Sequence, residues 1–133
     1  MTLTARVVLA LCLFPLPALT QTPMTGAEFE AYVTGKTITY HQFDAPYGVE
    51  EYLSGRKVRW AFTANECQYG TWYEAGEEIC FVYDYDPVPQ CWTFWVDARG
   101  LNGLFSGNGA GEELTEVEQS DQPLPCPGPD LGV

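Results

Sequence analysis

The chain contains one histidine, His41, so a Ser-His-Asp or Cys-His catalyst in this protein would have to use it. His41 stands beside Gln42 in a segment of strand-like composition, and no motif of nucleophilic catalysis surrounds it. Because a catalytic histidine needs partners at defined positions, we expect a structural or surface role for this residue. We therefore predict a protein that is not an enzyme, and a hydrolase that uses His41 or a pair of acids is the least favoured alternative.

Carboxylates are the second group that could do chemistry, since paired acids can hydrolyse glycosides and clustered acids can hold calcium. They gather in three runs, Glu74 to Glu78, Asp84 to Asp86 and Glu112 to Glu118. The chain has no EF-hand loop, and Glu116 and Glu118 alternate as the solvent face of an edge strand would. We expect solvated acidic faces, no metal site and no cofactor. The glycine-rich stretch Gly103 to Gly111 lacks the Gly-Lys-Ser/Thr ending of a phosphate loop, so we interpret it as a turn.

A cluster of cations between Tyr47 and Phe62 is the third candidate. Arg56, Lys57 and Arg59 lie within four positions of an otherwise acidic chain, among aromatic residues. One interpretation is cross-strand pairing with acids, which we favour for Arg59. The other is a recognition patch at the mouth of a barrel, which we favour for Arg56 beside the expected turn at Gly55. The predicted binding residues are Tyr47, Tyr52, Arg56, Arg59 and Trp60.

The first 20 residues have the order of a secretory signal peptide. Arg6 precedes an apolar run from Val7 to Leu16, which is too short for a spanning helix, and small residues follow it. We expect cleavage after Thr20 or after Ala18, and a mature chain without a membrane span in the periplasm or outside the cell.

Charge restricts the partners of the mature chain. The whole chain has six Lys and Arg against 18 Asp and Glu, a net charge of −12, and removal of Arg6 with the leader leaves −13. Nucleic acid and anionic membrane surfaces are therefore not expected as partners. A small ligand, a cationic protein or no partner at all fits such a charge.

Four cysteines follow the leader, an even number that indicates two disulfides in a small exported chain. Three connectivities are possible. Cys80 and Cys91 flank an aromatic segment with a turn expected near Tyr85-Asp86 and with Pro87 and Pro89 in that turn, so we expect them to be opposed across a hairpin and to form one pair. Cys67 and Cys126 remain as the second pair, which would tie a proline-rich tail to the body of the protein.

The pattern along residues 21–133 predicts a single β-rich domain with one N-terminal helix. Thr25 and Glu28 have the spacing of a capping box, which predicts a helix from about Gly26 to Thr34. Segments with period-two alternation follow, separated by turn residues. The expected strands cover about 36–43, 57–64, the two arms of a hairpin about Ala75 to Glu77, 91–96, 100–107 and 113–119, with Trp92, Phe94 and Val96 on one face of theirs. We predict a mainly β fold, a small antiparallel β-barrel or curled meander sheet with one short helix, two disulfides and an irregular C-terminal tail, present as a monomer.

Four motifs resemble a family of small exported proteobacterial proteins of unknown function: TGAEFEAY, YGVEEYLSGRKVRWAF, GTWYEAGEEICFVY and PQCW. The resemblance covers nearly the whole mature chain, and it implies export and one domain without implying an activity. A second likeness, to the disulfide-bonded barrels of periplasmic lysozyme inhibitors, is limited to Ser54-Gly55.

Two functions are therefore expected. The first is a non-enzymatic binding module with an aromatic and basic recognition patch. The alternative is an acidic, inhibitor-like protein that docks a cationic enzyme through its charge.

Overall fold

The computed structural model describes residues 21–63, 66–107 and 112–127. The predicted leader therefore lies outside the described residues, as do residues 108–111 of the glycine-rich stretch and the end of the tail.

The predicted N-terminal helix is present as α1, Gly26–Val33, and its start follows from local hydrogen bonding. The Thr25 hydroxyl accepts from the Glu28 amide at 3.2 Å, and the Glu28 carboxylate accepts from the Thr25 amide at 2.8 Å. This reciprocal pair is the predicted capping box, and it satisfies amides that the first turn leaves without partners. Gly35, at φ 83°, then turns the chain into the first strand.

Eight strands form a closed barrel in which each strand pairs antiparallel with the next, and β1 pairs with β8. The predicted mainly β fold, a small antiparallel barrel with one helix, is thus confirmed. The strands are β1 Thr37–Gln42, β2 Ala45–Leu53, β3 Lys57–Ala61, β4 Gln68–Ala75, β5 Glu78–Tyr83, β6 Asp86–Asp97, β7 Gly100–Phe105 and β8 Glu113–Ser120.

Closure changes the role expected for Glu116, because every strand, including β8, has a neighbour on each side. The Glu116 carboxylate is half-buried and accepts from the Tyr32 hydroxyl at 2.8 Å and from the Leu101 amide at 2.9 Å. The expectation of a solvated edge-strand acid was wrong for this residue, which instead fastens α1 to the barrel wall.

The turn of the β5–β6 hairpin is tighter than expected. Tyr83 pairs with Asp86, so Pro87 and Pro89 lie in β6 and not in the turn. The strand tolerates them because β7 pairs only from Trp92 onward, so residues 86–90 have no ladder partner on that side among the described residues. Of the three residues predicted to share a face, Trp92 and Phe94 are buried and Val96 is exposed, and Trp95 on the other face is buried as well.

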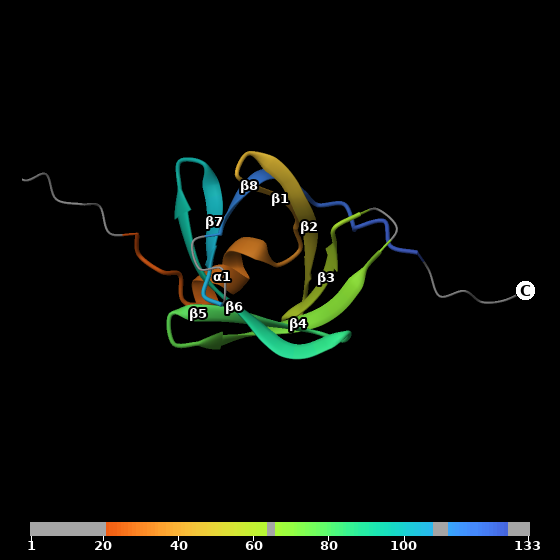
Figure 1. The fold of residues 1–133 in the computed structure, drawn as a ribbon, viewed down its shortest axis with the longest axis horizontal. Helices are drawn as coiled ribbons and strands as arrows, with labels where there is room; N and C mark the ends of the chain where they lie inside the picture. The colour runs from red at the N-terminus through yellow and green to blue at the C-terminus, as the bar shows by residue number, and fades with distance from the viewer. Residues whose placement is uncertain (1–20, 64–65, 108–111, 128–133) are drawn as a thin grey trace, which may run out of the picture.

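The helix occupies the interior of the barrel, where the ring of strands surrounds it (Figure 1). Phe29 is fully buried. Its ring packs edge-on against Trp72 at 5.1 Å between centroids and is tilted against Phe94 at 4.6 Å. Val33 is also fully buried. Because small barrels must fill their interior with side chains, α1 supplies the part of the core that the strands alone leave empty.

Both predicted disulfides are present. Cys80 and Cys91 are opposed in the β5–β6 ladder, with their Cα atoms 4.0 Å apart. Cys67 and Cys126 join the start of β4 to the C-terminal tail, with a Cα separation of 5.7 Å. Such cross-links are typical of proteins in oxidising compartments. Within the described part of the chain, no helix combines the length and apolarity that crossing a bilayer requires.

Candidate functional site

The two ends of the barrel differ in what fills them. The β2–β3, β4–β5 and β6–β7 turns lie at one end, which α1 closes, because Glu30 on the helix pairs with Arg56 at 3.1 Å and the Gly26 amide donates to Glu74. The β1–β2 and β5–β6 turns lie at the opposite end, together with the strand ends beside them. The side chains at that end surround an open cavity.

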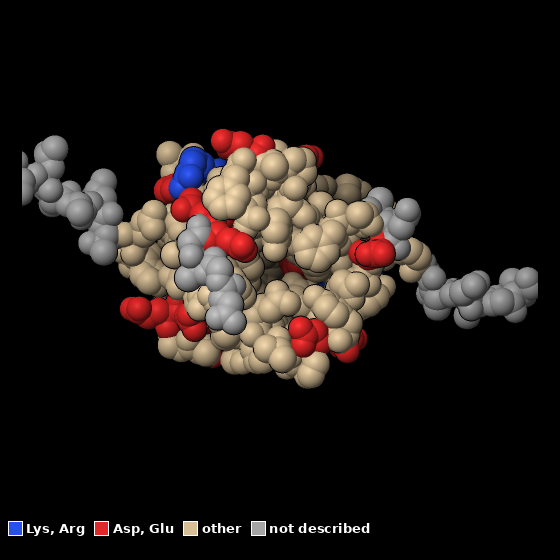
Figure 2. All heavy atoms as spheres, in the orientation of Figure 1, with Lys and Arg blue, Asp and Glu red and all other residues tan. Residues whose placement is uncertain are grey.

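This cavity, which we call the aromatic cavity, has a volume of about 80 Å³. Of the 13 side chains that line it, only Glu50, Gln90 and Leu114 are not aromatic. Figure 2 shows the face of the molecule hollowed over the barrel interior, with mostly uncharged atoms around the hollow. The aromatic lining residues are Tyr40, Tyr47, Tyr52, Trp60, Phe62, Phe81, Tyr83, Tyr85, Trp92 and Phe94.

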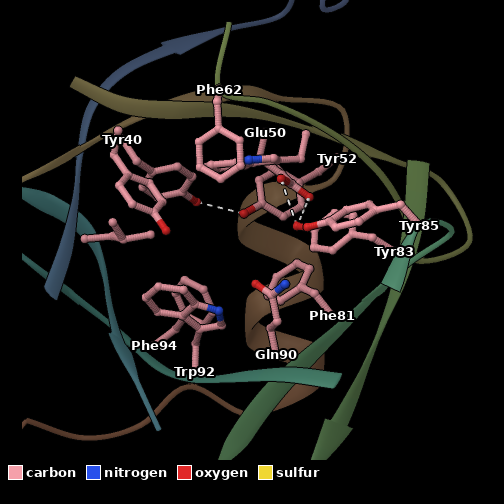
Figure 3. A pocket seen from close by; sticks show the side chains of 13 residues that line it. Tyr40, Glu50, Tyr52, Phe62, Phe81, Tyr83, Tyr85, Gln90, Trp92 and Phe94 are labelled. Carbon is pink, nitrogen blue, oxygen red and sulfur yellow. Dashed lines mark hydrogen bonds between the residues drawn. The ribbon is translucent and has the colours of Figure 1, made fainter. Parts of the chain in front are cut away.

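Strand alternation explains why these side chains converge. Successive residues of a strand point to opposite faces, so every second residue of a barrel strand points inward. On β5, Phe81 and Tyr83 line the cavity, and on β6 Gln90, Trp92 and Phe94 do so. Figure 3 shows these side chains directed toward one another, with α1 behind them as the floor.

Two glycines make room for the larger rings. A Cβ atom on Gly48 would collide with the indole of Trp60, and one on Gly70 would come within 2.8 Å of the Tyr83 ring. The missing side chains therefore allow Trp60 and Tyr83 to lie flat against neighbouring strands. The space that the absent side chains leave is filled by these two rings, which form part of the cavity wall.

Glu50 is the only acid among the lining residues, and it is only 2% exposed. The Tyr83 hydroxyl donates to it and lies 3.2 Å from both carboxylate oxygens (Figure 3). Burial raises the pKa of this carboxyl well above its usual range, and the hydrogen bond from Tyr83 opposes the shift only in part. No ion pair to Glu50 is formed by any cation in the described residues.

A second polar pair lies beside Glu50. The hydroxyls of Tyr40 and Tyr52 are 2.8 Å apart, and both side chains are buried. Burial, more than any neighbour, raises the pKa of each phenol and also that of Tyr83 well above the usual value. These three hydroxyls are therefore neutral hydrogen-bonding groups at physiological pH.

The mouth of the cavity is also aromatic. Phe62 lies edge-on to Trp60 at 5.2 Å and to Tyr47 at 5.7 Å, and it is 56% exposed. Tyr47 has no opposite residue on β1, because the register of that ladder shifts between Tyr40 and His41. A β-bulge of this kind re-aims a side chain, and here Tyr47 is among the lining residues.

The predicted binding residues divide into two groups. Tyr47, Tyr52 and Trp60 line the aromatic cavity, whereas the two arginines do not. Arg59 lies opposite Glu51 in the β2–β3 ladder and pairs with it at 2.5 Å, as the cross-strand interpretation predicted. The Glu51 carboxylate also accepts from the Leu124 amide at 2.9 Å, so this outer face of β2 holds the C-terminal tail.

Arg56 lies at the helix end of the barrel. Besides its pair with Glu30, its guanidinium stands over the Trp72 ring at 4.6 Å from the centroid. Its φ of 59° and the φ of 73° at Gly55 form the tight turn that was expected to carry it outward. Its role in recognition stays a prediction.

Neither the strand β2 nor a role for Glu50 in binding was predicted from the sequence. Pro46, Gly48 and two adjacent glutamates lower the strand propensity of Ala45–Leu53. A signal was nevertheless present, because Glu50 stands two positions before Tyr52 and two after Gly48, which places all three on one face of a strand. An acid in register with an inward-facing aromatic residue is the pattern that identifies this site.

Comparison with protein-family models, with curated proteins and with solved structures gives no match to the chain.

Proposed function

We propose that this protein is an exported, non-enzymatic binding module that holds part of a small ligand in the aromatic cavity. The observation that carries the proposal is an open, largely aromatic cavity with one buried carboxyl at its wall. Ligand sites typically combine apolar walls with a few convergent polar groups, and barrels of this strand number can hold one small ligand.

The volume limits what can bind. At about 80 Å³, the cavity is roughly half the size of an apolar cavity, ~150 Å³, that accommodates benzene. It can therefore enclose a compact group, while the rest of a larger ligand extends past Phe62 and Tyr85 at the mouth. Export is supported by the predicted leader and by the two disulfides.

A fragment screen by ligand-observed NMR on the purified protein tests the proposal. Gln90 lines the cavity from β6, so the larger side chain of Gln90→Phe should occupy it and abolish the saturation transfer of genuine cavity ligands. Val88→Phe is the matched control on the same strand, because Val88 is 65% exposed and does not line the cavity.

Fragments that bind the wild type and Val88→Phe but not Gln90→Phe would support the proposal. If no fragment distinguishes Gln90→Phe from the wild type, the cavity is not a binding site. In that case, a cationic protein that is retained from a periplasmic extract at low salt and lost at high salt would favour the inhibitor-like alternative.

A further inference from the structure

We propose that the aromatic cavity recognises the positively charged head group of an organic ammonium compound, with Glu50 as its counter-ion. This inference rests on the proposed function and specifies its ligand class.

The first argument is the unbalanced charge of the site. Glu50 is nearly inaccessible, has one neutral hydrogen-bonding partner in Tyr83, and lines an open space. Buried carboxyls in proteins are normally paired with a cation or a metal, or else held protonated. A cationic group that enters the cavity would supply the missing partner, whereas an anion would meet a buried acid.

The second argument is the arrangement of the rings. The faces of Trp, Tyr and Phe attract cations, and cages of such rings are the usual means of recognising quaternary ammonium groups. Trp60 and Phe62 are nearly perpendicular, at 85° between their planes, and Tyr47 lies at 74° to Phe62. Rings at such angles present their faces from several directions, and this arrangement suits a compact cation. A flat ligand would instead be held between two parallel rings.

The third argument is that no cation in the described part of the chain lines the cavity. Arg59 is on the outer face of β2 and β3 with Glu51, and Arg56 is at the helix end with Glu30. Neither lines the aromatic cavity. The net charge of −12 for the whole chain also favours the approach of a cation over that of an anion.

The carboxyl gives this recognition a dependence on pH. In the free protein, the raised pKa keeps the Glu50 carboxyl protonated at pH values at which an exposed glutamate is already ionised. A bound ammonium group stabilises the carboxylate, so binding releases a proton and the affinity rises with pH until Glu50 is ionised in the free protein. The hydroxyls that face it, on Tyr40 of β1, Tyr52 of β2 and Tyr83 of β5, stay neutral over this interval because their own pKa values are raised.

The experiment compares tetramethylammonium with a neutral probe of similar shape, neopentyl alcohol, by titration calorimetry and by NMR line broadening. The wild type should bind tetramethylammonium more tightly as pH rises, by up to about tenfold for each pH unit, and should prefer it to the alcohol. Glu50→Gln keeps the shape of the side chain and should weaken tetramethylammonium binding by about ten- to a hundredfold, because a charge-assisted contact is lost. Glu112→Gln is the control, since it removes an exposed acid that acts electrostatically on Tyr47 without lining the cavity.

Equal weakening by Glu50→Gln and Glu112→Gln would show a general effect of charge and would overturn the inference. The inference would also be overturned if the wild type preferred neopentyl alcohol and its affinity for tetramethylammonium did not rise with pH. In either case, fragments that Gln90→Phe excludes would leave the proposed binding function intact. If Gln90→Phe excludes no fragment and tetramethylammonium fails to bind, both proposals are wrong.

Discussion

Replacing Glu50 with glutamine should make the protein more stable at neutral pH, and the gain should grow as pH rises. The folded state binds the Glu50 proton more tightly than the unfolded state does, because the pKa is raised from an ordinary value of 4.5. Below about pH 4.5 the carboxyl is protonated in both states, so its contribution to folding is complete. As pH rises through the interval up to the folded pKa, the unfolded chain ionises freely while the folded chain does not, and stability is lost.

The size of this effect follows from one proton. Within that interval, the wild type should lose up to about 1.4 kcal/mol of unfolding free energy per pH unit relative to Glu50→Gln, which cannot ionise. Two other groups with large shifts contribute little to the pH dependence between about pH 5 and about pH 8. Asp97 has its pKa lowered from 3.8 to about 2 by hydrogen bonds from Arg99, and Tyr32 has its pKa raised from 10.0 to about 12 by burial. Glutamine can still accept the hydrogen bond from Tyr83, so the packing of the site is kept.

Urea unfolding followed by tryptophan fluorescence, from about pH 4 to about pH 8, measures the difference between the two proteins. Subtracting one curve from the other cancels the groups that both share. Glu118→Gln, which removes an exposed carboxyl of β8, is the control and should run parallel to the wild type. If the curve of Glu50→Gln also runs parallel to the wild type, Glu50 ionises normally in the folded protein, and the account of its burial is wrong.

Three further predictions concern the elements that hold the site. Phe29→Ala should lower the unfolding free energy by about 3 to 5 kcal/mol in urea titrations, because it empties the packing between α1 and the barrel; a loss below about 1 kcal/mol would mean that the helix does not fill the core. Arg56→Ala should cost about 1 kcal/mol in the same measurement, because its ion pair is nearly half exposed and it also covers Trp72, and it should leave probe binding in the cavity unchanged; a large loss of binding would assign it to recognition after all. Replacing Cys67 and Cys126 together by serine should cost at most about 4 kcal/mol in thermal or urea unfolding, the value for a loop with a sequence separation of 59; an unchanged midpoint would show that the tail is held without the disulfide.

The sequence predicts the local features of this fold well because each depends on near neighbours. The capping box needs only Thr25 and Glu28, and the Cys80–Cys91 pair needs only the register of one hairpin. These features follow from spacing alone. Tyr47, Tyr52 and Trp60 were grouped because they lie near the cations in the sequence, and strand alternation placed only Trp60, on β3, on the face opposite Arg59.

The parts that could not be predicted depend on contacts between distant segments. The residue pattern near Glu116 does not predict that β8 pairs with β1, or that the Glu116 carboxylate accepts a hydrogen bond from the Tyr32 hydroxyl of the helix. Likewise, Glu50 and Glu51 are adjacent acids in the sequence, yet one faces the interior and the other holds Arg59 and the tail on the outside. Propensity rules treat such residues alike, and only closure of the barrel separates them.

The pairing of β1 with β8 also sets an order for oxidative folding. The first strand of the barrel completes its ladder only when the last one is available, and non-local pairing of this kind is slow. Cys80 and Cys91, separated by 11 positions within one hairpin, can oxidise before the ring closes. Cys67 and Cys126 are separated by 59 positions, and the tail that carries Cys126 is held on the outside of β2 by Glu51, so we expect this pair to oxidise later. Trapping free thiols during refolding should therefore capture an intermediate that has the hairpin disulfide alone. The time at which the second disulfide forms would then report when the barrel closes.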